Sequence, residues 1–205
     1  MTTLHVVLAS DNAGKLKEFS AILSQAGVRM TPQNELGVKA ADEPHGTFVE
    51  NALAKARHAS NKTGMPALAD DSGLCVAALS DAPGVYSARY AARAGRGQSD
   101  QANNAYLLEQ LKDCTDRRAS YVAVLVFVRF PDDPRPLIVE GTWQGEILRE
   151  PRGEHGFGYD PCFWLPDLQR TAAELEPEVK NQHSHRGQAL RALLQRLLTT
   201  QRVQP

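Results

Sequence analysis

Cysteine is scarce in this chain, which contains Cys75, Cys114 and Cys162 among 205 residues. The three are far apart, and none belongs to a CxxC pair or to a Cys/His spacing typical of zinc ligands. The sequence therefore excludes a disulfide framework and a structural zinc site. We interpret the three residues as ordinary buried thiols of a reducing compartment and expect a cytoplasmic protein.

An excess of basic charge is also absent, because 23 Lys and Arg against 24 Asp and Glu give a formal net charge of −1. Proteins that bind duplex nucleic acid usually rely on a broad positive field. We therefore expect no nucleic-acid partner. An anionic ligand would need a local cluster of basic side chains and backbone N–H groups.

Long hydrophobic runs are missing as well. The longest, residues 121–128, is too short to cross a bilayer, and the opening MTTLHVVLAS lacks the basic segment of an export signal. We expect no membrane partner. Hydrophobic residues at 42% and charged residues at 23% are ordinary for a globular protein. Without repeats or low-complexity linkers, residues 1–205 are interpreted as a single domain.

Hydrophobic periodicity predicts an α/β protein. Strand-length apolar runs occupy residues 4–9, 28–31 and 119–130, and helical spacing covers residues 16–26, 104–111 and 189–198. Thr47 and Glu50 form a capping box for a helix that ends at Gly64. Residues 137–140 and 142–148 read as two further strands of an antiparallel meander. We predict a mixed central β-sheet flanked by helices, in two lobes with a cleft between them.

The stretch SDNAGK, residues 10–15, joins the first strand to the first helix. It is not a Walker loop, because Ala9 stands where that loop needs glycine and Leu16 stands where it needs Ser or Thr. N–H groups at a helix start and the charge of Lys15 can nevertheless hold a phosphate. The alternative is that Ser10 or Asn12 only caps the helix.

Asp70 and Asp71 interrupt an apolar segment, where unpaired charges are costly. Neighbouring residues of a strand point to opposite faces, so at most one of the two would face a given cleft. The alternative is a turn in which both are solvated.

Asp42 and Glu43 form a second acidic pair before a helix, and carboxylates with water are the ligands that Mg²⁺ takes. A solvated loop is the alternative. Lys55 on the following helix could reach a phosphate or only water.

Residues 153–161 concentrate glycine around Phe157 and Tyr159. Either ring could stack on a planar base, or pack inward instead. Lys180, His185 and Arg186 follow near the last helix, and the last two can donate to a carbonyl and a ring nitrogen, as recognition of a 6-oxopurine requires. The alternative is a plain basic segment before the helix, although basic residues at a helix start oppose its dipole.

Six segments in order along the chain resemble the inosine/xanthosine triphosphate pyrophosphatase family, the house-cleaning nucleoside triphosphate pyrophosphatases. They are SDNAGK with Glu18, TFVENA with Lys55, ADDSGL, PGVYSARY, FGYDP and SHRGQA. They span residues 10–189. The family more often places its glycine one residue before Gly46, which leaves open whether Asp42 or Glu43 is the metal ligand.

The resemblance implies an enzyme that hydrolyses ITP, dITP and XTP to the monophosphate and pyrophosphate with Mg²⁺, as a cytoplasmic homodimer. Asp71 would be the catalytic base and would bind the metal with Glu43 or Asp42. The implied substrate-binding residues are Ser10, Asp11, Asn12, Ala13, Gly14, Lys15, Lys55, Ser72, Phe157, Gly158, Tyr159, Asp160, Lys180, His185 and Arg186. Two alternatives are a pyrophosphatase for pyrimidine or methylated nucleotides, which FGYDP and Ser184 to Arg186 argue against, and a regulatory module that binds nucleotide without hydrolysis.

Overall fold

The computed structural model describes residues 3–11 and 13–202; at positions 13, 14 and 200–202 the description covers the backbone alone. Asn12, predicted to bind substrate, lies outside the described residues. The strands are β1 (Leu4–Leu8), β2 (Val28–Pro32), β3 (Ala67–Val76), β4 (Arg118–Val128), β5 (Leu137–Ile147), β6 (Phe163–Leu165) and β7 (Arg170–Thr171). The α-helices are α1 (Ala13–Leu23), α2 (Phe48–Thr63), α3 (Tyr90–Arg93), α4 (Asp100–Gln110), α5 (Pro177–His183) and α6 (His185–Arg202).

One seven-stranded sheet has the order β2-β1-β3-β4-β5-β6-β7. β1 runs parallel to β2 and to β3, whereas β6 runs antiparallel to β5 and to β7. The predicted α/β class with a mixed sheet is therefore confirmed. In the described part of the chain, no helix has both the length and the apolar character that a membrane crossing requires.

The chain divides into two compact units. The first takes in Met1–Asp71, Ala123–Glu140 and Gln188–Pro205, and the second takes in Ser72–Val122 and Gly141–Gly187. The long strands β3, β4 and β5 each contribute residues to both units. The single domain and the cleft between lobes stay predictions.

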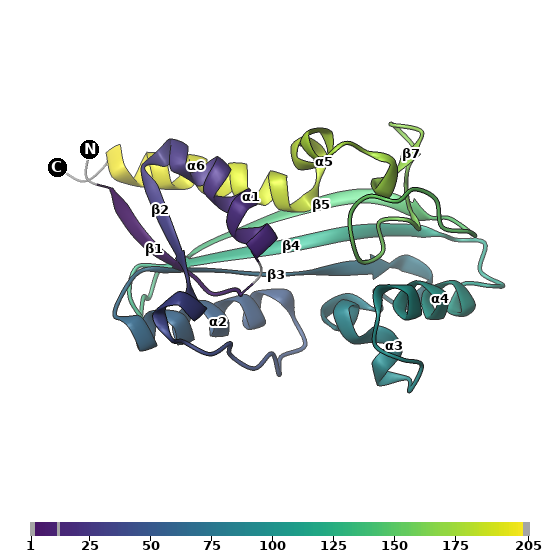
Figure 1. Ribbon diagram of the computed structural model, residues 1–205, viewed down its shortest axis with the longest axis horizontal. Coiled ribbons are helices and arrows are strands. Elements are labelled where there is room, and N and C mark those ends of the chain that lie inside the picture. Colours follow the sequence, from purple (N-terminus) through teal and green to yellow (C-terminus); the bar gives the residue numbers. More distant parts are fainter. Residues whose placement is uncertain (1–2, 12, 203–205) are drawn as a thin grey trace. The chain divides into compact units, whose positions relative to one another are not determined.

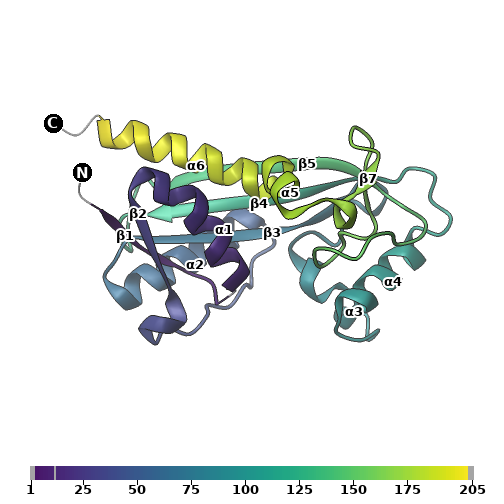
Figure 2. The ribbon, with the colours of Figure 1, turned by 45° about the horizontal axis from the view of Figure 1, so that its top comes forward.

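In the first unit, helices cover both faces of the sheet. Figures 1 and 2 show α1 and α6 on one face and α2 on the other. Phe19 and Leu23 of α1 pack with Leu190 and Leu193 of α6 in one buried cluster that also includes Leu8 of β1. Helix α2 covers the other face through three fully buried alanines, which are Ala52, Ala56 and Ala59.

The predicted capping box at α2 is confirmed in its first half. Thr47 Oγ1 accepts a hydrogen bond from the Glu50 backbone N–H at 3.3 Å. The Glu50 carboxylate accepts from the Thr47 hydroxyl at 2.6 Å, so it returns to the cap through the side chain. Gly64, with φ of 68°, ends the helix.

The second unit has its own apolar cluster. Leu107 and Leu111 pack there with Leu74 of β3 and with aromatic residues of β4 and β6. The rings of Tyr121 and Phe163 have centroids 4.5 Å apart. This cluster supports α4 and the segment that precedes β6.

The meander prediction was wrong at Gly141, where two strands were expected. β5 is one strand from Leu137 to Ile147. Val139, Gly141 and Trp143 are all buried, so the alternation of buried and less buried positions continues through the glycine. Gly141, which the sequence suggested as a break between two strands, is accommodated in one strand because the residues on either side of it keep the two-residue alternation of buried positions.

Candidate functional site

Both predicted carboxylates lie within a continuous strand. Asp70 is 1% exposed and Asp71 is 7% exposed, and β3 runs without a break from Ala67 to Val76. The alternative of a solvated turn was wrong, because both charges have cationic partners inside the fold. As expected for neighbours in a strand, the partners lie on opposite faces: Asp70 pairs with Lys15 of α1, and Asp71 contacts α2.

On the α2 face, four side chains form what we call the acidic-lysine cluster: Glu43, Asn51, Lys55 and Asp71. Lys55 Nζ lies 2.8 Å from Glu43 Oε1 and 3.2 Å from Asp71 Oδ1. Asn51 Nδ2 donates to Asp71 Oδ2 at 3.1 Å. Asn51 and Lys55 are one helical turn apart, so one face of α2 supplies both donors.

Burial sets the proton affinities of this cluster. Burial raises the pKa of the Asp71 carboxyl; the charge of Lys55 opposes the rise, the charge of Glu43 adds to it, and the net direction is upward. For Lys55, burial alone would lower the pKa, but Asp71, Asp70 and Glu43 outweigh it and the pKa is raised. Lys55 therefore stays protonated, while Asp71 has a higher proton affinity than an exposed aspartate.

Asn51 was not singled out as a site residue by the sequence. It is fully buried, and besides its bond to Asp71 it accepts from the His45 N–H at 3.0 Å and donates to the His45 carbonyl at 3.2 Å. One amide side chain thus ties Asp71 to the loop that carries Glu43. The signal in the sequence was its position one turn before Lys55.

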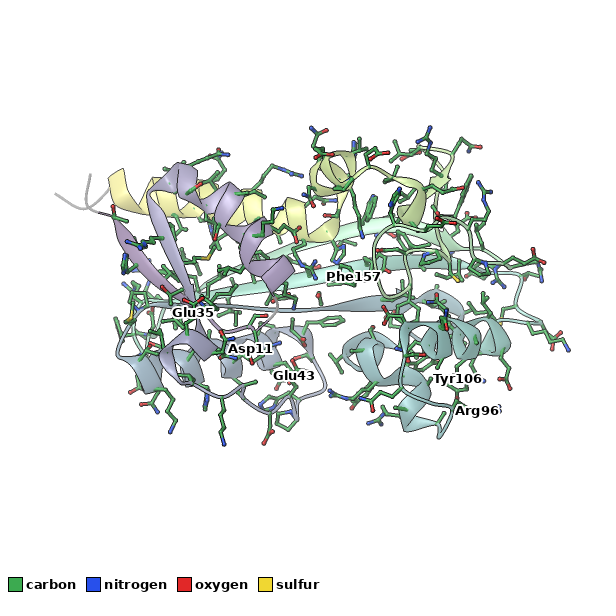
Figure 3. The ribbon with its side chains drawn as sticks, in the orientation of Figure 1. Asp11, Glu35, Glu43, Arg96, Tyr106 and Phe157 are labelled. Atoms are coloured by element: carbon green, nitrogen blue, oxygen red, sulfur yellow. The ribbon has the colours of Figure 1, made fainter. Side chains whose placement is uncertain are left out.

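The acidic-lysine cluster has donors that suit a hard divalent cation. Glu43 and Asp71 converge on the same ammonium nitrogen, so their oxygens can share a cation, and Mg²⁺ takes such oxygens together with water. Asp42 is exposed, and Glu43 is the member of the acidic pair that reaches a partner of Asp71. Figure 3 shows Glu43 on the loop that precedes α2. Among residues 3–11 and 13–202, no group of three or more His, Cys, Asp or Glu side chains is arranged so that it could hold a metal ion.

The predicted phosphate loop precedes α1, which begins at Ala13. Ser10 is half-buried, and Asp11, which Figure 3 labels, is exposed. Lys15 Nζ lies 3.0 Å from Asp70 Oδ1 and 2.9 Å from Oδ2. The lysine is thus held at the sheet by a buried carboxylate.

In the second unit, residues 153–160 form what we call the aromatic loop. Phe157 is 61% exposed, whereas Tyr159 is 3% exposed and donates its hydroxyl to the Ser87 carbonyl at 2.8 Å. Of the two rings proposed to stack on a base, Phe157 is therefore the one presented at the surface of its unit. Two cations flank it, with Lys180 Nζ 5.0 Å and Arg186 Cζ 5.8 Å from the ring centroid.

Asp160 organises the backbone of this loop. Its Oδ2 accepts from the Phe157 N–H at 2.8 Å and forms an ion pair with Lys180. Its Oδ1 accepts from the Tyr121 hydroxyl at 3.3 Å. Gly156 has φ of 81°, and a Cβ there would lie 2.1 Å from Asp160 Oδ2, so only glycine lets the loop close over the carboxylate.

The first turn of α6 adds His185 and Arg186, which are both buried. His185 stacks on the Tyr121 ring, with centroids 4.8 Å apart and an interplanar angle of 11°. Arg186 Nη2 lies 3.4 Å from Ser72 Oγ. The sequence assigned Tyr121 only to a strand, yet it supports both His185 and Asp160.

Comparison with known proteins identifies relatives along nearly the whole chain. Residues 6–196 match the Ham1 family. The dITP/XTP pyrophosphatase of Burkholderia pseudomallei is 67% identical over 192 residues, which are 94% of this chain and 92% of that protein. The dITP/XTP pyrophosphatase of Bordetella pertussis is 64% identical over 195 residues, 95% of this chain and 92% of that protein. The structure of a HAM1 protein from Coxiella burnetii superposes with a TM-score of 0.90 at 52% identity and covers 95% of this chain and 98% of that one.

Proposed function

Because the chain belongs to the Ham1 family, we propose that it is a nucleoside triphosphate pyrophosphatase that hydrolyses ITP, dITP and XTP. The products are the nucleoside monophosphate and pyrophosphate. The observation that carries the proposal is the 67% identity to a dITP/XTP pyrophosphatase over 94% of the chain. The acidic-lysine cluster and the aromatic loop supply residues suited to the two ends of such a substrate.

The reaction needs a water molecule to attack the α-phosphorus while the bond to the bridging oxygen breaks. We assign Asp71 as the general base that accepts the proton of this water. Burial raises its pKa, and a general base becomes more effective as its pKa moves from that of a surface carboxylate toward the working pH. The leaving pyrophosphate takes the bridging oxygen.

Positive charge offsets the charge that develops on the leaving group. Lys55 is kept protonated by its neighbours, and Lys15 is held by Asp70, so both ammonium groups are prepositioned for phosphate oxygens. Backbone N–H groups of residues 10–15 would add donors. Asp71 and Glu43 would hold a divalent metal, assigned as Mg²⁺, which when bound makes water more acidic and neutralises phosphate charge.

Base recognition is assigned to the second unit. Phe157 would stack on the purine, and His185 and Arg186 would donate to its oxygen and ring nitrogen. A 6-aminopurine offers a donor where a 6-oxopurine offers an acceptor, so a fixed arginine favours the oxo form. Ser72, Gly158, Tyr159, Asp160 and Lys180 complete the predicted substrate contacts.

A panel of triphosphates with Mg²⁺ tests the function, with pyrophosphate and orthophosphate measured separately. In water enriched in ¹⁸O, attack at the α-phosphorus places the label in the monophosphate. We expect pyrophosphate release from ITP, dITP and XTP well above that from ATP, with labelled monophosphate. Release of orthophosphate alone would identify a different enzyme, and binding without turnover would favour the regulatory module.

We further propose that the chain works as a homodimer in the cytoplasm and removes deaminated nucleotides from the nucleotide pool. Sedimentation velocity tests the first part, since a monomer at micromolar concentration would contradict it.

A further inference from the structure

The aromatic loop is held from a second side by helix α4. Asp100 Oδ2 accepts from the Gly158 N–H at 2.6 Å, and Asn104 Nδ2 donates to the Gly158 carbonyl at 2.7 Å. Asp100 and Asn104 are one helical turn apart, so the first two turns of α4 bind both polar groups of one peptide residue. We call this pair of contacts the Gly158 latch.

The orientation of the Asn104 amide follows from its surroundings. Asn104 is 9% exposed, and its Nδ2 also donates to the Asp100 carbonyl at 2.8 Å. A flipped amide would set its oxygen against two carbonyl oxygens, so the donor must face Gly158. The latch therefore requires an acceptor at position 100 and a donor at position 104.

The helix that carries the latch is itself anchored. Asn103 is buried, accepts from the Ala91 N–H at 2.9 Å and donates to the Ala88 carbonyl at 3.3 Å. Leu107 and Leu111 are fully buried on the same segment. Because α4 is fixed against the core of its unit, a residue of α4 that binds Gly158 also fixes the aromatic loop relative to that core.

We propose that Asp100 and Asn104 are positioning residues for base recognition, acting through the Gly158 latch on Phe157. The proposal depends on the function assigned above, in which Phe157 stacks on the purine. Asp160 already holds the Phe157 N–H, and the latch fixes the next peptide. Phe157 can then stay 61% exposed on a backbone that is fixed at two consecutive residues.

A ring that is already fixed loses less conformational entropy when the base binds. The latch therefore strengthens base binding without contacting the base. Loss of one latch contact should weaken binding of inosine monophosphate by about five- to tenfold, the effect of one hydrogen bond. Binding of pyrophosphate, which has no base, should change less than about twofold. In turnover, KM for ITP should rise and kcat should stay nearly constant.

The test begins with amide hydrogen exchange at Gly158 in the protein without nucleotide, which needs no activity. Asp100→Ala should speed this exchange at least about tenfold, since a charge-assisted bond is lost. Asp100→Asn keeps an oxygen acceptor and should preserve most of the protection. Asn104→Ala removes the second contact independently, and Asn104→Asp should be at least as severe because a carboxylate would face the Gly158 carbonyl.

Calorimetric titration of the same variants with inosine monophosphate and with pyrophosphate completes the test. Glu109→Ala is the matched control on α4, because Glu109 is exposed and pairs only with Arg96 among the described contacts. Unchanged Gly158 exchange in both alanine variants would overturn the latch. Faster exchange with unaltered inosine monophosphate affinity would overturn its role in base binding. If the unmutated chain neither binds inosine monophosphate nor releases pyrophosphate from ITP, the function assigned above fails, and the exchange data still decide whether the latch exists.

Discussion

Replacing Asp71 by asparagine separates the chemistry of this site from its architecture. The side chains have the same shape, but asparagine cannot accept a proton at neutral pH. Loss of a general base typically lowers turnover by about 100- to 10,000-fold, which corresponds to about 2.7–5.4 kcal/mol of activation free energy. Nucleotide affinity should stay within about tenfold, because Lys15 and Lys55 remain.

The fold should tolerate this change. The oxygen of an asparagine side chain can still accept from Asn51 or from Lys55. Its NH₂ group then faces the other donor, and this lost hydrogen bond should lower the free energy of unfolding by about 1–2 kcal/mol. Part of that cost is offset, because burial raises the pKa of Asp71: folding destabilises the ionised carboxylate relative to the unfolded chain, and a neutral amide does not carry this cost. Lys55 retains Glu43 at 2.8 Å.

The assay is the initial rate of pyrophosphate release from ITP, with thermal unfolding measured in parallel. Glu35→Gln is the matched control, since Glu35 is an exposed carboxylate of the same unit. Turnover of Asp71→Asn within about threefold of the unmutated chain would remove Asp71 from the mechanism. Full recovery of turnover at high Mg²⁺ would show that Asp71 serves as a ligand alone and would refute its role as base.

Three further predictions concern other residues. Arg186→Ala should raise KM for ITP more than for ATP, because the lost donor serves only the 6-oxo group; equal effects in steady-state kinetics would defeat that assignment. Gly156→Ala should lower the free energy of unfolding, measured by denaturant titration, by on the order of 2 kcal/mol, because its φ is 81° and its Cβ would lie 2.1 Å from a carboxylate oxygen. Gly46→Ala is the control, because a Cβ there meets no atom within 4 Å and the change should be nearly neutral. Cys162, whose pKa burial raises to about 11, should be alkylated at pH 8 much more slowly than Cys75, as peptide mass spectrometry would show; equal rates would contradict the buried thiol.

Features that depend on neighbours in the sequence were predictable from it. The cap at Thr47 and the apolar stripe of α6 both follow from residues within a few positions of one another. The strand through Asp70 and Asp71 stayed ambiguous, because the partner that makes burial of Asp70 tolerable lies 55 residues earlier. No local pattern reports such a contact.

The same reason explains what the sequence missed at the candidate site. Asn104 and Gly158 are 54 residues apart, and Asn104 reads as an ordinary polar position of an amphipathic helix. Tyr121 reads as a strand residue until His185 is seen stacked on it. Motif resemblance identified residues proposed to contact substrate, whereas the residues that support them emerged only from their contacts.

The composition of the first unit has a consequence for biosynthesis. Its buried cluster combines β1, near the start of the chain, with Leu190, Leu193 and Leu197 near the end. During translation this cluster therefore stays incomplete, with the apolar side chains that face α6 exposed, until α6 has emerged from the ribosome. A chain that stops before α6 would leave this hydrophobic surface permanently open to aggregation.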